Sequence, residues 1–237
     1  MMGTLINALA IVAGGLLGTV LGKFINTRLQ DGLTKACGVS VLFIGILGAM
    51  EKMLNVQDST LTGSGTMLVV SCLALGTLVG ELINIEAAFE RFGLWLKQKT
   101  GNAKDGSFVD AFVSASFTVC IGAMAIVGAI EDGISGNWSV LGAKAVLDLV
   151  IILIMTCAMG KGCMFSAIPV AILQASVTLL ASFLRPLMTV AALNNLSMIG
   201  SVLIFCVGIN LVWGKTVRVA NMLPAVILAI VAAFLPF

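Results

Sequence analysis

Residues 138–160 have the sequence WSVLGAKAVLDLVIILIMTCAMG. It is apolar over most of its length, and as a helix it is long enough to cross the roughly 30 Å hydrocarbon core of a bilayer. Similar apolar segments precede and follow it, at 3–24, 36–54, 65–84, 107–130, 166–184, 196–213 and 219–236. The sequence therefore predicts an all-α membrane protein with about eight transmembrane helices.

The composition agrees with this fold and excludes several functions. Hydrophobic residues make up 59% of the chain and charged residues 10%, whereas a soluble domain has about 25% charged residues. We therefore expect a single polytopic domain over residues 1–237, with the lipid bilayer as its surroundings. The chain has no histidine and no Cys-x-x-Cys pair, which argues against a metal site and a cofactor. A net charge of +2 without a basic run argues against nucleic acid as a partner.

Lysine and arginine are unevenly distributed among the connectors. The odd-numbered connectors hold ten of them: Lys23, Arg28, Lys35, Arg91, Lys97, Lys99, Lys104, Lys161, Lys215 and Arg218. The even-numbered connectors hold only Lys52 and Arg185. Because cytoplasmic loops carry an excess of these residues, both termini are predicted to lie outside the cytoplasm. Within the third connector, residues 85–100 have apolar residues at helical spacing, which is typical of an amphipathic helix in the cytoplasmic interface.

A short motif occurs twice and indicates an internal repeat. The pattern Cys-x-Gly-x5-Gly begins at Cys120 in the fourth span and again at Cys206 in the seventh. A shift of three spans reverses the direction of the chain, so spans 3–5 and 6–8 are predicted to form an inverted-topology repeat of the kind found in many secondary transporters. The motif glycines Gly122, Gly128 and Gly208 could mark unwound helix at a binding site, or they could simply allow close helix packing.

Four polar residues inside apolar segments are the other candidates for a solute or ion site. Lys144 and Asp148 are four residues apart, so they share one face of the fifth span. Charges at that depth are costly and should face the bundle interior, either as a site or as a mutually satisfied ion pair. Gln174 and Asn210 lie within the sixth and seventh spans. Their amides need partners, which could be other helices or a solute.

Several stretches resemble one known family. They are GTLINA at 3–8, CIGAMAIVG at 120–128, the pair Lys144 and Asp148, and FSAIP at 165–169. Together they resemble the YqgA/YdfK-like family of bacterial multi-pass membrane proteins, catalogued as domain of unknown function 554. The resemblance covers essentially the whole chain and implies a prokaryotic plasma-membrane location. It implies neither a substrate nor a reaction.

The function that these observations favour is secondary transport of a small solute or ion, with a site near the bilayer midplane. A non-transporting scaffold that binds a cytoplasmic partner through residues 85–100, or an ion channel, is the alternative. No set of catalytic residues is recognisable, so we do not expect an enzyme. Glycines at four-residue spacing form two helix faces that could also hold a second copy of the chain: Gly14, Gly18 and Gly22, and Gly76 and Gly80.

Overall fold

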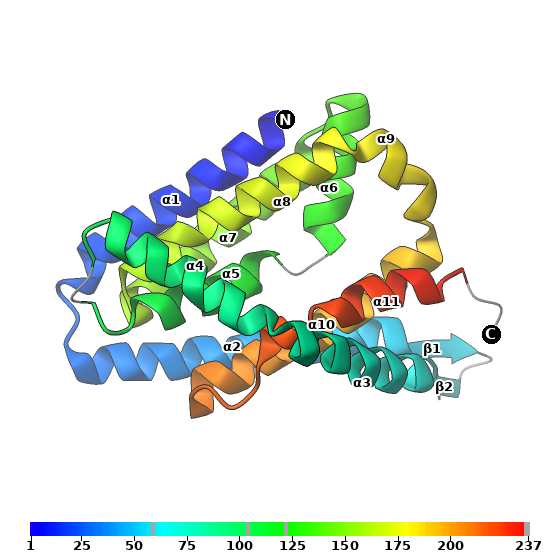
Figure 1. Cartoon of the computed structure of the whole chain (residues 1–237), viewed down its shortest axis with the longest axis horizontal. Coiled ribbons are helices and arrows are strands. Elements are labelled where there is room, and N and C mark those ends of the chain that lie inside the picture. Colours follow the sequence, from blue (N-terminus) through cyan, green and yellow to red (C-terminus); the bar gives the residue numbers. More distant parts are fainter. Residues whose placement is uncertain (58–59, 103–104, 121–122, 235–237) are drawn as a thin grey trace.

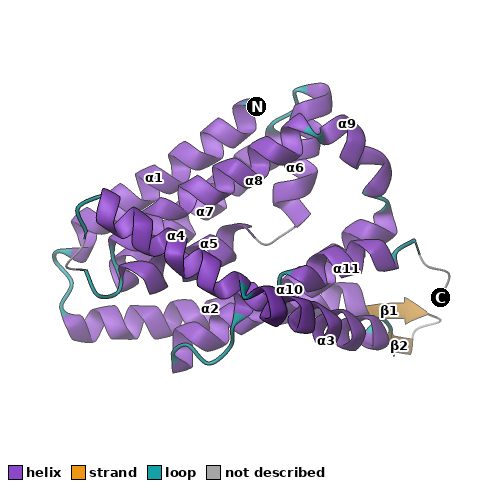
Figure 2. Cartoon of the chain, viewed as in Figure 1, coloured by secondary structure: helices purple, strands orange, loops and turns teal. Residues whose placement is uncertain are grey.

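The computed structural model describes residues 1–57, 60–102, 105–120 and 123–234, and helices dominate it (Figures 1 and 2). The α-helices are α1 Met2–Gly22, α2 Thr27–Met53, α3 Thr66–Ile83, α4 Ile85–Lys99, α5 Phe108–Cys120, α6 Ala123–Ser135, α7 Ser139–Met159, α8 Ala167–Leu179, α9 Ala181–Leu184, α10 Val190–Trp213 and α11 Pro224–Ala232. Short 3-10 helices are η1 Lys161–Ser166, η2 Arg185–Leu187 and η3 Val219–Met222. The predicted all-α membrane fold is confirmed.

Six helical stretches in the described part of the chain are long and apolar enough to cross a membrane: Met2–Gly22, Arg28–Met53, Thr66–Ile83, Ser139–Met159, Lys161–Leu179 and Val190–Trp213. The predicted span 107–130 is not one straight helix. It is divided into α5 and α6, whose axes differ by 62°, and the two together can count as a seventh span. The last predicted span contains only the shorter apolar helix Val219–Ala232. Eight spans therefore stay a prediction.

The inverted repeat also stays a prediction. Its two matched motifs lie in helices of different form. α10 continues unbroken through Cys206 and Gly208, whereas the other motif begins at Cys120, the last described residue of α5, and continues outside the described residues. If a repeat relates spans 3–5 to spans 6–8, the middle span of one copy is the continuous α10, and that of the other consists of α5 and α6, whose axes differ by 62°.

The helices form two groups with α5 between them (Figure 1). In the first group α1 lies along α7, with α6 and α8 beside them. In the second group α2 lies along α10, while α3 lies along α11. α5 contacts α7 and α8 on one side and α10 on the other, and α4 packs against α5. The middle of the molecule is therefore built around the divided span.

Glycines permit the close contacts within each group. A Cβ on Gly18 of α1 would lie 2.6 Å from the Leu153 carbonyl oxygen of α7. A Cβ on Gly45 of α2 would lie 2.6 Å from the Phe205 amide nitrogen of α10. Gly80 of α3 contacts the backbone of η3 in the same way. The glycine faces of α1 and α3 are thus occupied within one chain, and a contact between copies stays a prediction.

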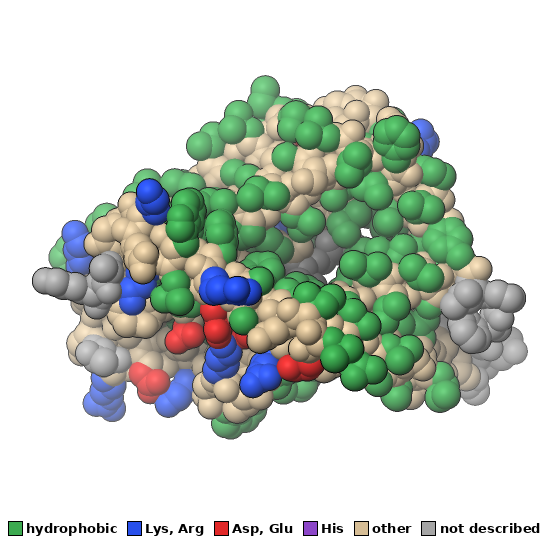
Figure 3. Space-filling model, in the orientation of Figure 1, with side chains coloured by type: hydrophobic (Ala, Val, Ile, Leu, Met, Phe, Trp, Pro, Cys, Tyr) green, Lys and Arg blue, Asp and Glu red, His purple; other side chains and the backbone are tan. Residues whose placement is uncertain are grey.

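Charged side chains gather at one end of the molecule, on the left in Figure 3. We call this the charged end, and it contains the connectors after α1, α4, α7 and α10. Ion pairs link its elements; one of them joins Arg218 to Glu81 over 3.0 Å. Away from this end, many leucine, isoleucine and valine side chains of α1, α2 and α3 are exposed, as expected for lipid-facing helices. The opposite end contains an antiparallel hairpin of β1 Leu54–Gln57 and β2 Thr60–Gly63, which the apolar pattern does not predict.

Candidate functional site

A buried ion pair lies on α7, next to the end of α5. The Lys144 ammonium donates to Asp148 Oδ2 over 2.5 Å, as the four-residue spacing predicts. Only 7% of Lys144 and 3% of Asp148 are exposed. The same ammonium donates to the Val119 carbonyl oxygen of α5, 2.8 Å away. The pair therefore links two helices, and it occurs where the fourth span is divided.

Val119 lies one residue before Cys120, the last described residue of α5. The Lys144 ammonium therefore lies against the backbone in the last turn of the described part of this helix. Cys120 also lies near Lys144 and Asp148.

Two buried amides lie on α1 and α8. Asn7 of α1 and Gln174 of α8 are completely inaccessible to solvent. The Asn7 amide lies beside the Asp148 carboxylate, whereas the Gln174 amide has no hydrogen-bond partner among the described residues. The hydroxyl groups of Thr4 and Thr178, on the same two helices, are also buried without such a bond. Buried polar groups normally have partners, and a buried water molecule is a common one.

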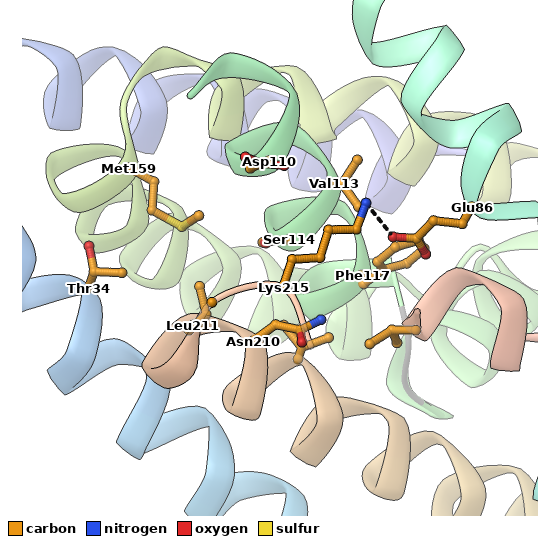
Figure 4. A pocket seen from close by; sticks show the side chains of 13 residues that line it. Thr34, Glu86, Asp110, Val113, Ser114, Phe117, Met159, Asn210, Leu211 and Lys215 are labelled. Carbon is orange, nitrogen blue, oxygen red and sulfur yellow. Dashed lines mark ion pairs between the residues drawn. The ribbon is translucent and has the colours of Figure 1, made fainter. Parts of the chain in front are cut away.

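A cavity of about 250 Å³ opens between the two helix groups at the charged end. Its lining comes mainly from α5 and α10: Thr34, Glu86, Asp110, Val113, Ser114, Phe117, Met159, Val207, Asn210, Leu211, Gly214, Lys215 and Val219. In Figure 4 the labelled residues of α5 face those of α10 across this space. Lys144 and Asp148 do not line the cavity. Along α5, however, it extends to Phe117, two residues before Val119.

Lys215 lines the cavity and pairs with two glutamates of α4, and Figure 4 shows its ion pair with Glu86. Its ammonium lies 3.1 Å from Glu86 and forms a second ion pair with Glu90. Partial burial of Lys215 disfavours its charge, but hydrogen bonds to Glu90 and Glu86 outweigh that effect and raise the pKa of Lys215. Glu86 itself is buried and accepts a hydrogen bond from the Ala220 amide over 3.0 Å. These ion pairs and this hydrogen bond link α4 to the segment that follows α10.

The remaining sequence candidates have other contacts. A Cβ on Gly128 would lie 2.9 Å from Leu141, and one on Gly208 would lie 2.7 Å from the Leu42 amide nitrogen. Both glycines therefore serve helix packing in this structure. Gly122 lies outside the described residues.

Asn210 lines the cavity, but its side chain also shapes the turn after α10. It donates to the Val217 carbonyl oxygen over 2.7 Å and accepts from the Thr216 and Val217 amides. Of the predicted residues, the structure thus brings together Lys144 and Asp148. The contributions of Asn7 and of the Val119 carbonyl oxygen are additional.

The fold and the interrupted span with its ion pair define a polytopic α-helical membrane protein. The chain belongs to the family described as "Protein of unknown function (DUF554)", whose model matches residues 2–234. It is 30% identical over 233 residues to "Uncharacterized protein YqgA" of Escherichia coli (strain K12), covering 96% of this chain and 94% of the relative. It is 26% identical over 234 residues to "Uncharacterized membrane protein YdfK" of Bacillus subtilis (strain 168), covering 99% and 96%. No solved structure matches the chain significantly.

Proposed function

We propose that the chain is a secondary transporter that moves a small solute or ion across the prokaryotic plasma membrane. One observation carries the proposal: the axes of α5 and α6 in the fourth span differ by 62°, and Lys144 of the buried pair donates to the Val119 carbonyl oxygen in the last turn of the described part of α5. In many secondary transporters, broken helices expose backbone groups that bind solutes or ions near the membrane midplane. An ion pair that only locked helix packing would not need an interrupted helix beside it.

The cavity gives a second line of support. It opens at the charged end, which we expect to face the cytoplasm because of its excess of lysine and arginine. It follows α5 from Asp110 to Phe117 and thus leads toward the interruption. A volume of about 250 Å³ suits a small solute or a hydrated ion. In this proposal the structure represents a state that is open toward the cytoplasm.

The scaffold alternative has less support, because part of the apolar face of α4 packs inside the chain, although Leu94 and Trp95 are 47% and 51% exposed. The Phe89 ring packs 5.0 Å from the Phe117 ring of α5, centroid to centroid. The Phe92 ring packs 5.8 Å from the Phe112 ring, also of α5. A cytoplasmic partner would need that face to be free. In our proposal α4 lies in the cytoplasmic interface and closes the cavity wall.

Ligand binding followed by transport tests the proposal. The purified protein is screened for thermal stabilisation by inorganic ions, amino acids and polyamines, since a ligand that binds the native state raises its stability. Any stabilising compound is then offered to proteoliposomes that contain the wild type or the double variant Lys144→Met/Asp148→Leu. We expect uptake by the wild type and none by the folded double variant. Equal uptake by both would remove the site assignment, and no uptake of any stabilising compound would reject transport.

A further inference from the structure

The atoms around the Lys144 ammonium are those of a cation site. Asp148 provides a carboxylate oxygen at 2.5 Å and Val119 a carbonyl oxygen at 2.8 Å. Helix C-termini and unwound carbonyl groups are the groups that hold Na⁺ or a proton in secondary transporters. Asn7 of α1 lies beside Asp148. The Asp148 and Val119 oxygen atoms suit an alkali-metal ion as well as they suit an ammonium group.

We propose that Lys144 occupies a monovalent-cation site and that a free cation competes there with the lysine proton. This inference rests on the proposed transport function and names its substrate class. The ammonium gives its proton to a water molecule and becomes a neutral amine. Asp148 then retains one uncompensated negative charge, and a monovalent cation from solution neutralises it. The proton leaves as the cation binds, so the total charge of the site is unchanged.

Burial makes the two occupants mutually exclusive. The pair is almost completely inaccessible, with 7% of Lys144 and 3% of Asp148 exposed. A second positive charge beside a protonated lysine would be uncompensated at this depth, and buried unpaired charges are strongly disfavoured. Among the described residues, the other titratable group facing the pair is the Cys120 thiol of α5, while α1 contributes the uncharged Asn7. A site that holds either the cation or the proton exchanges one for the other.

Removing the lysine while keeping its ligands isolates the cation site. Lys144→Ala leaves the Asp148 carboxylate and the Val119 carbonyl oxygen in place with space between them. The melting temperature of this variant is measured in detergent with increasing NaCl, KCl or LiCl, each compared with choline chloride at the same ionic strength. We expect at least one inorganic cation to stabilise the variant progressively. Lys144→Ala/Asp148→Asn is the matched control, and it should respond equally to all four salts because the carboxylate is gone.

If Lys144→Ala does not fold, the wild type provides the decisive measurement. Because the cation competes with a proton, its apparent affinity should rise with pH by up to about tenfold for each pH unit. The same four salts are therefore compared at several pH values. The inference is overturned if NaCl, KCl and LiCl change the melting temperature of folded Lys144→Ala no more than choline chloride does. If that variant does not fold, the inference is overturned when the four salts change the melting temperature of the wild type equally at every pH.

These measurements separate this inference from the proposed function because they need no membrane. Cation binding by the purified protein, without cation movement in proteoliposomes, would support the site and reject transport. Transport of a solute by a protein whose Lys144→Ala variant binds no cation would support transport and reject the cation site.

Discussion

The Lys144 ammonium lies 2.8 Å from the Val119 carbonyl oxygen, although the two residues are 25 positions apart in the sequence. This contact joins α7 to the end of α5 at the point where the fourth span is divided. It uses one of the three donors of the ammonium, and Asp148 uses a second. The Lys144 ammonium therefore contacts both helices, and substitution of Lys144 or Asp148 should affect the stability of the protein as well as binding.

Removing one charge of the pair should destabilise the protein more than removing both. Asp148→Leu leaves a buried ammonium without its carboxylate, and we expect a loss of about 3–5 kcal/mol. Lys144→Met/Asp148→Leu removes both charges and should lose clearly less. Thermal unfolding in detergent compares the two variants. The control is Lys52→Met, which removes a more exposed ion pair with Glu51 and should change stability by less than about 1 kcal/mol. A double variant less stable than Asp148→Leu would contradict the prediction.

The contact between α3 and η3 should tolerate no side chain at Gly80. An added Cβ would collide with the Asn221 carbonyl oxygen, and backbone atoms cannot move aside cheaply. We expect Gly80→Ala to lower stability by about 1–3 kcal/mol, the usual cost of overpacking. Gly32→Ala is the matched control, because a Cβ at Gly32 of α2 meets nothing within 4 Å. Equal melting temperatures for the two variants would show that this helix contact is looser than described.

The sequence predicts the helices of this protein better than their interruptions. The apolar segment 138–160 corresponds to α7, Ser139–Met159, because its ends are marked by a change from apolar to polar or glycine residues. No polar residues mark the bend within segment 107–130, since both α5 and α6 are apolar. Its sequence signal is the glycine motif that begins at Cys120, and that motif is equally compatible with close helix packing. The hairpin after α2 could not be predicted either, because no apolar run marks its strands.

The candidate site was predictable in part. Lys144 and Asp148 follow from charge and helical spacing alone. The Val119 carbonyl oxygen could not be predicted, because a backbone atom has no sequence signal and its role depends on how α5 meets α7. Asn7 carried a signal, as a polar residue within an apolar segment. Its neighbour Asp148 lies 141 positions away, and only the packing of α1 along α7 brings them together.

The ion pairs of Lys215 should make stability depend on pH at the alkaline end. The pKa of Lys215 is raised in the folded protein, so its pairs with Glu86 and Glu90 stabilise the fold below the ordinary lysine pKa of about 10.4. That contribution is lost as the pH rises through the higher folded-state pKa. We therefore expect the stability difference between wild type and Lys215→Met to be constant at lower pH and to shrink above it. Melting curves from about pH 8 to about pH 12 measure this difference. A stability difference that stays constant over this range would contradict the role given to the Lys215 ion pairs.

The charged end should face the cytoplasm. A cysteine introduced at Lys99, the last residue of α4, should be labelled by a membrane-impermeant maleimide only in inside-out vesicles. A reporter fused after Phe237 should be active only outside the cytoplasm. The native cysteines have to be replaced first, and all six are free of disulfide bonds. A cytoplasmic reporter at the C-terminus would reject the eight-span arrangement.

A bulky side chain in the cavity should block transport without unfolding the protein. Ser114 of α5 lines the cavity between Asp110 and Phe117, so Ser114→Trp would fill part of the roughly 250 Å³. We expect uptake into proteoliposomes to fall by about tenfold or more, which corresponds to at least about 1.4 kcal/mol in the barrier to solute movement.

The matched control for the blocked cavity is Val146→Trp. Val146 is 66% exposed on α7, the helix that holds the ion pair, and does not line the cavity. The same large side chain there should point away from the solute path and leave uptake close to that of the wild type. Thermal unfolding of both variants separates a blocked path from a damaged fold, because only the former lowers uptake at unchanged melting temperature. If Ser114→Trp folds and transports normally, the solute does not move along α5 as proposed, and it must reach Lys144 and Asp148 by another route.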